Sequence, residues 1–257
     1  PGGAALNALL ACALGVIVSR RSGLQSVGVV SILGAYLVPL AAGILRMEHT
    51  VTAPAYLVAV LAMSLVLAHA GPGGRALRAL TLVLHGTLSV LLLWRGWTPS
   101  LTAELFVVLS WGLFLAATVA ATVTEERRQI DTGELADAHP RDEADATRGE
   151  ATRVGRAMDS ISSDGVVITV ATLFAVGASF FFAGAWSGWR DLWAWLPLGQ
   201  AVLTLATAAQ LSAMSVRPAQ APTAALSSLL RILGVALVGV ALALLMSAEA
   251  ASFAWAI

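Results

Sequence analysis

Residues 105–123 read LFVVLSWGLFLAATVAATV, nineteen consecutive residues without a charged side chain. Such a run crosses the roughly 30 Å hydrocarbon core of a bilayer as a helix, because lipid offers no hydrogen-bond partner to an open backbone. Seven similar runs accompany it. Together they predict an all-α, polytopic transmembrane helix bundle of about eight spans, at roughly residues 4–19, 24–45, 52–70, 76–94, 104–123, 166–185, 195–215 and 226–246.

Composition supports a membrane protein and excludes several function classes. Of the 257 residues, 58% are hydrophobic and 12% are charged, whereas a soluble domain carries about 25% charged residues. All 15 basic residues are arginine. The lack of lysine excludes a retinal Schiff base, a phosphate-binding loop lysine and a pyridoxal-phosphate lysine. Cys12 is the one cysteine, so the chain forms no intrachain disulfide.

The charges divide the chain into three parts. Residues 1–123 hold the first five predicted spans, residues 124–165 form a charged loop, and residues 166–257 hold the last three. The loop contains 17 of the 30 charged residues. Its first half, to residue 141, predicts a mobile linker, and residues 142–162 predict a short amphipathic helix. The acidic surface of the loop is either a solvated face or a docking site for a soluble partner.

Arginine placement predicts the orientation of the spans. If the loops alternate sides, eleven arginines share the side of the 124–165 loop, and three lie opposite: Arg46, Arg95 and Arg190. Cytoplasmic loops carry the excess of arginine, so we expect the 124–165 loop in the cytoplasm and both termini outside. The chain begins at Pro1 without a basic leader, which indicates processed or excised sequence rather than a signal peptide.

Tryptophans cluster at the expected outer ends of the spans. Indole rings prefer the headgroup level of a membrane, where both the ring and the N–H are satisfied. The segment 186–195 predicts a short interfacial helix with tryptophans on one face. These residues are either an interfacial anchor or a platform for a glycan or partner: Trp186, Trp189, Trp193 and Trp195.

A few polar residues lie inside the predicted spans, where ionisable and amide groups are functional candidates by default. His85 lies in the fourth span, and Gln200 and Gln210 lie in the seventh. We expect them to make helix–helix hydrogen bonds. No carboxylate lies in mid-membrane, and the sequence contains no catalytic motif, metal site or cofactor site. Nucleic-acid binding has no support, because the charge-rich segment is net acidic.

Pro39 interrupts the second span and predicts a kink. Proline has no N–H, so the carbonyl of Ala35, four residues earlier, loses its usual helical partner. Broken helices line the binding sites of transporters. Tyr36, Pro39 and His85 therefore mark a candidate intramembrane cavity, against the simpler interpretation of a structural kink.

Small residues recur four positions apart in three spans. Such faces allow two helix backbones to approach closely. The three faces are Ala11, Gly15 and Ser19; Gly112, Ala116 and Ala120; and Thr204, Ala208 and Ser212.

Several short motifs resemble a family of bacterial multi-spanning membrane proteins, the domain of unknown function numbered 2339. The string from Ser31 to Leu40, SILGAYLVPL, is similar to the family's Gly-Gly-aromatic-Leu-Thr-Pro stretch, with Ala35 and Val38 departing from it. Three further segments resemble the family: residues 75–78, 94–97 and 113–128. The resemblance implies an integral envelope protein and carries over no catalytic residue. We expect the protein in the bacterial cytoplasmic (inner) membrane.

The function expected from these observations is structural. The leading hypothesis is a non-catalytic membrane subunit or scaffold that packs with partner membrane proteins and with lipid. The alternative is a transporter, or a component handling envelope lipid or polysaccharide, with a cavity near Pro39 and His85. A third hypothesis is a sensor whose acidic loop binds a soluble protein.

Overall fold

A computed structural model describes residues 2–41, 51–69, 74–94, 101–131, 164–181, 190–214 and 222–245. The described residues form helices, with no strand among them, which confirms the all-α class. The helices are α1 (Gly2–Ser22), α2 (Gln25–Ala41), α3 (Thr52–His69), α4 (Gly74–Trp94), α5 (Leu101–Asp131), the helix Asp164–Phe181, α7 (Arg190–Met214) and α8 (Pro222–Leu245).

Five of these helices are long and apolar enough to cross a membrane: α3, α4, α5, the helix Asp164–Phe181 and α8. The protein is therefore a membrane-type helical bundle. A shorter apolar stretch, Ser26–Ala41, lies in α2. Each of the eight predicted spans coincides with a helix, and membrane passage of α1, α2 and α7 stays a prediction.

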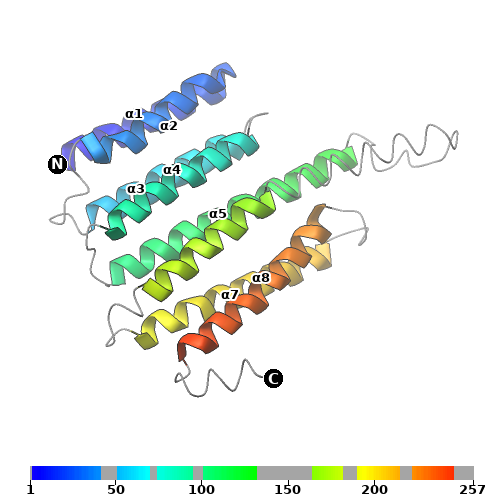
Figure 1. Cartoon of the computed structure of the whole chain (residues 1–257). Coiled ribbons are helices and arrows are strands. Elements are labelled where there is room, and N and C mark those ends of the chain that lie inside the picture. Colours follow the sequence, from blue (N-terminus) through cyan, green and yellow to red (C-terminus); the bar gives the residue numbers. More distant parts are fainter. Residues whose placement is uncertain are drawn as a thin grey trace, which may run out of the picture.

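The helices are arranged as successive pairs that follow the order of the chain (Figure 1). α1 pairs with α2, α3 with α4, and α7 with α8. α3 also contacts α1 on one side and α5 on the other, and α5 continues the row to α7 and α8. The first and last pairs consequently lie at opposite ends of the bundle.

Glycine and serine allow α1 and α2 to pack closely. The turn between them uses Gly23 at a φ of 71°, a left-handed conformation that suits glycine. Just before it, the Ser19 hydroxyl donates to the Leu24 carbonyl at 2.9 Å. A Cβ on Gly15 would overlap the side chain of Ser31, and one on Gly28 would overlap Leu67. Bulkier residues at these glycines would force the helices apart.

The structure corrects the expected start of the polar linker. α5 continues to Asp131, so residues 124–131 are helical rather than part of a mobile loop. Glutamate and arginine are good helix formers, and residues 125–128 consist of these two types. The predicted amphipathic helix at 142–162 lies outside the described residues.

The start of α7 also differs from expectation. Residues 190–195 form the first turns of α7 and continue through Pro197, rather than ending a separate interfacial helix. Residues 186–189, including Trp186 and Trp189, lie outside the described residues. Trp193 belongs to α7, and the Trp195 side chain is exposed.

Candidate functional site

A deeply buried histidine, His85, lies on α4. It is 2% exposed, and its Nε2 lies 3.0 Å from the hydroxyl oxygen of Ser110 on α5. The carbonyl of His85 accepts a hydrogen bond from the Ser89 hydroxyl at 2.7 Å. The histidine thus joins α4 to α5 inside the bundle, which is the helix-bridging role expected for it.

Aromatic rings surround the imidazole. The Phe106 ring centroid lies 5.5 Å from that of His85, the Phe114 centroid 6.1 Å, and the Tyr36 centroid 6.3 Å in an edge-on arrangement. The structure therefore brings Tyr36 and His85 together, as the cavity hypothesis requires. We call Tyr36, His85, Phe106, Ser110 and Phe114 the histidine cluster.

Three buried polar atoms in and beside the histidine cluster have no hydrogen-bond partner among the described residues. They are the Tyr36 hydroxyl, His85 Nδ1 and the Thr81 hydroxyl, one turn before His85. The Ser64 side chain is the polar neighbour of the Tyr36 hydroxyl, although the two hydroxyl groups are not positioned to form a hydrogen bond. Buried polar groups are usually paired, so these atoms are the strongest structural sign of a polar ligand in this region.

Pro39 has a clear structural consequence. α2 continues two residues beyond it, to Ala41. The carbonyl of Ala35 accepts a hydrogen bond from the hydroxyl of Tyr56 on α3, with the two oxygens 2.7 Å apart. Both residues are buried. Tyr56 thus replaces the backbone donor that proline lacks, and the broken hydrogen bond of α2 is repaired by its neighbour.

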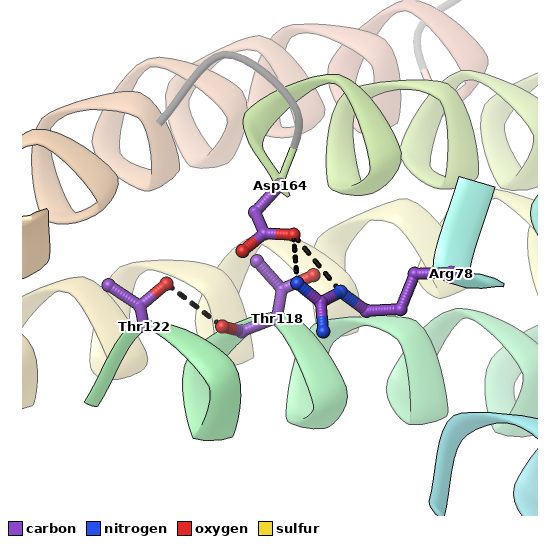
Figure 2. A network of polar contacts seen from close by, with 4 residues as sticks. All are labelled: Arg78, Thr118, Thr122 and Asp164. Carbon is purple, nitrogen blue, oxygen red and sulfur yellow. Dashed lines mark hydrogen bonds and ion pairs between the residues drawn. The ribbon is translucent and has the colours of Figure 1, made fainter. Parts of the chain in front are cut away.

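A buried ion pair joins α4 to the helix Asp164–Phe181. Arg78, in the second turn of α4, donates from Nε at 3.0 Å and from Nη2 at 2.7 Å to Oδ1 of Asp164. The two side chains are 7% and 10% exposed. Figure 2 shows the pair beside Thr118 of α5, which lies between it and Thr122. The Thr122 hydroxyl donates to the Thr118 carbonyl at 2.9 Å.

The ion pair fixes the point at which the chain re-enters the bundle after the charged loop. Asp164 is the first described residue of its helix, and Arg78 comes from a helix 86 positions earlier. Removing one partner of a buried pair leaves an uncompensated charge and costs about 3–5 kcal/mol. The pair therefore specifies how α4 and the helix Asp164–Phe181 meet.

The two glutamines occupy different environments. Gln200 of α7 is 2% exposed, and neither its amide nitrogen nor its amide oxygen has a hydrogen-bond partner among the described residues. Gln210 is exposed on the same helix. The structure brings neither glutamine to the histidine cluster through a described contact. Their expected role in helix contacts stays a prediction.

The described groups of the histidine cluster are polar side chains packed among aromatic rings. Within the described ranges, no three His, Cys, Asp or Glu side chains gather as metal ligands. His85 faces a serine and aromatic rings, and no carboxylate among the residues that the structure describes orients it as a general base would require. The arrangement is suited to hydrogen bonding and packing.

Comparisons with known proteins give no assignment. No family model matches the chain, and neither the curated proteins nor the solved structures contain a match to it. The resemblance to the bacterial membrane family therefore stays a prediction from its motifs.

Sequence reasoning missed three of the residues that shape these sites. Tyr56 and Ser110 carry no motif, although each is a polar side chain within an apolar run. Asp164 offered a better signal, because an aspartate directly before an apolar run is a candidate for an inward-facing charge. Its arginine partner was interpreted as a loop charge.

Proposed function

We propose that this chain is a non-catalytic membrane subunit that holds a partner membrane protein against α5. The observation that carries the proposal is an uncovered face on this central helix. The face consists of Leu105, Leu109, Gly112, Ala116 and Ala120 and is named the α5 face here. Leu105 and Leu109 are about half exposed, Ala116 and Ala120 are exposed, and Gly112 is partly exposed.

Spacing makes the α5 face continuous. Its members lie four, three, four and four residues apart, which places them on one side of an α-helix. From Leu105 to Ala120 the helix rises about 23 Å, most of the thickness of the hydrocarbon core. A Cβ built on Gly112 meets no heavy atom within 4 Å. A second helix could lie along this whole stretch.

The other two small-residue faces show how this chain uses such surfaces. In α1, Gly15 lies against Ser31 and Ser19 lies beside Gly28 of α2. In α7, Ala208 is buried, and its carbonyl accepts a hydrogen bond from Ser227 of α8 at 3.1 Å.

Both of those faces contact another helix of the bundle, whereas no described helix covers the α5 face. Small side chains offer lipid little contact area and allow a helix backbone to approach closely. These features favour a transmembrane helix of another protein as the occupant of the α5 face.

A photo-crosslinking residue at Ala116 tests this proposal in intact membranes. We expect a discrete adduct with one other membrane protein. The adduct should be lost in Gly112→Leu, which fills the α5 face. Gly177→Leu is the matched control, because Gly177 is exposed on the helix Asp164–Phe181 and its Cβ also meets nothing within 4 Å. Adducts with lipid alone, or equal loss in both variants, would contradict the proposal. An adduct of twice the chain's mass would replace it with self-association.

A second candidate function is transport through the histidine cluster. It is favoured by the Tyr36 hydroxyl and His85 Nδ1, which have no hydrogen-bond partner among the residues described and lie on the contacting helices α2 and α4. The experiment is Ser110→Cys in a Cys12→Ala background, with a water-soluble thiol reagent. Labelling of the cysteine at position 110 would support a cavity that water reaches. Protection of that cysteine from the reagent would favour the membrane-subunit proposal.

The orientation of the chain follows from its arginines. We propose a bacterial cytoplasmic membrane location, with both termini outside and the 124–165 loop inside, because arginine favours the cytoplasmic side. In that loop, a soluble partner remains the third candidate. Deleting residues 132–163 would abolish partner binding without unfolding the bundle if the sensor hypothesis holds.

A further inference from the structure

An arginine lies exposed in the apolar part of the last helix. Arg231 is nine residues beyond Pro222, about 14 Å along the axis of α8. It falls within Thr223–Leu245, one of the stretches that are long and apolar enough to cross a membrane. A charged group in this setting is costly unless it reaches the interface or finds a counter-charge.

Hydroxyl groups hold the Arg231 side chain in place. Nη2 of Arg231 donates to the hydroxyl of Ser212 on α7 at 2.7 Å. That hydroxyl lies 2.6 Å from the hydroxyl oxygen of Ser227, which is bonded in turn to the Ala208 carbonyl. We name Arg231, Ser212 and Ser227 the arginine–serine cluster. Its hydrogen bonds fix the guanidinium between α7 and α8 without supplying negative charge.

The contact with Ser212 also fixes the depth of the guanidinium. Ser212 is two residues before the last residue of α7, and Ser227 is five residues after the first residue of α8. Helical side chains lean toward the N-terminus of their helix, which directs Arg231 toward this end of the hairpin. The charged group therefore reaches the rim of the bundle, where lipid headgroups lie.

Within the described ranges, no carboxylate forms an ion pair with Arg231. The buried ion pair of the bundle joins two other residues, Arg78 and Asp164. A guanidinium has five N–H donors and binds phosphate oxygens in a fork. Most of its donors remain for an external acceptor after the bond to Ser212.

An apolar strip continues from Arg231 along the lipid-facing side of α8. Val235 and Leu242 lie four and eleven residues further on and are 66% and 50% exposed. Between Arg231 and Leu242 the helix rises about 16 Å, close to the thickness of one leaflet of the hydrocarbon core. The strip has the length and polarity that an acyl chain requires.

We propose that the arginine–serine cluster binds the phosphate of an anionic phospholipid, whose acyl chain lies along Val235 and Leu242. The inference is independent of the α5 face. An anionic lipid is favoured over a zwitterionic one, because its phosphate has no cation of its own competing with Arg231.

The test uses the full chain in nanodiscs of phosphatidylcholine and phosphatidylglycerol, with retained lipid measured by native mass spectrometry. We expect the protein to retain a phosphatidylglycerol molecule in preference to phosphatidylcholine. Arg231→Gln should lower that retained fraction about tenfold. Ser212→Ala should lower it less, because the charge remains but loses its fixed position.

Arg75→Gln is the matched control. Arg75 is exposed at the start of α4, so this variant removes the same charge away from the arginine–serine cluster. Equal retention by Arg231→Gln and the unaltered chain would overturn the proposal, as would an equal loss in Arg75→Gln. Loss of a protein partner in Arg231→Gln with lipid retention unchanged would assign the site to an acidic helix instead. If Arg231→Gln does not fold by circular dichroism, Ser212→Ala and Arg231→Lys decide on the same criteria.

Discussion

The hydrogen bond from Tyr56 to the Ala35 carbonyl makes a quantitative prediction about a proline inside an apolar helix. Tyr56→Phe removes the hydroxyl and keeps the ring, so the change is confined to one donor. The carbonyl cannot turn to its own helix, because Pro39 has no N–H. Leaving a buried acceptor unpaired costs about 1–3 kcal/mol, and interhelical bonds in membranes reach about 1.7 kcal/mol. We expect Tyr56→Phe to lower the free energy of unfolding by about 1.5 kcal/mol.

The same variant should cost much less in a Pro39→Ala background. Alanine at this position carries an N–H that can bond to the Ala35 carbonyl, so the phenol becomes a second donor rather than the sole one. We expect a cost of about 0.5 kcal/mol in that background, and therefore a coupling energy of about 1 kcal/mol between positions 39 and 56.

These four proteins, the unaltered chain, the two single variants and the double variant, form a double-mutant cycle. Reversible unfolding in mixed micelles with increasing dodecyl sulfate, followed by circular dichroism, measures the free energy of unfolding of each. Tyr36→Phe is the matched control, because the Tyr36 hydroxyl is buried without a hydrogen-bond partner in the described part of the chain and its removal should be nearly neutral in both backgrounds. An equal cost of Tyr56→Phe in the unaltered chain and in Pro39→Ala would refute the reasoning. The tyrosine would then stabilise the bundle through packing alone.

Two further predictions concern helix contacts. Arg78→Ala should lower the free energy of unfolding by about 3–5 kcal/mol. The double variant Arg78→Met with Asp164→Leu should restore much of that stability, because no buried charge is left unpaired. If the double variant stays unstable in the same unfolding assay, the pair does more than compensate charge. Gly15→Leu should separate α1 from α2 and lower the free energy of unfolding by at least about 2 kcal/mol. Gly177→Leu is the control and should change stability little. Equal effects of the two variants would contradict the close approach of Gly15 to Ser31.

The parts of the fold that depend on local sequence could be predicted, and those that depend on distant partners could not. Helix positions follow from hydropathy, because an apolar run must satisfy its own backbone in lipid. The loss of the backbone hydrogen bond to the Ala35 carbonyl follows from Pro39 four residues later. Tyr56 does not follow, because its role depends on which helix lies next to α2.

The ion pair shows the same limit. Arg78 and Asp164 are 86 positions apart, and nothing local identifies one as the partner of the other. The polar residues after Thr124 led to a different error, since their charge indicated a linker while their helix propensity extended α5 to Asp131. The histidine cluster was predicted in part: the sequence marked Tyr36 and His85, whereas Ser110 became apparent from its position opposite the imidazole.

The arrangement of α7 and α8 has a consequence for biogenesis and evolution. These two helices pack closely against each other, and both also contact α5. A Cβ on Gly165 of the helix Asp164–Phe181 would contact Leu229 of α8. A pair of this kind can enter the bilayer together during synthesis and dock afterwards as a unit. Gene duplication or loss could also add or remove such a pair at the end of the row without redesigning the interior, so relatives of this chain could differ in length by whole hairpins.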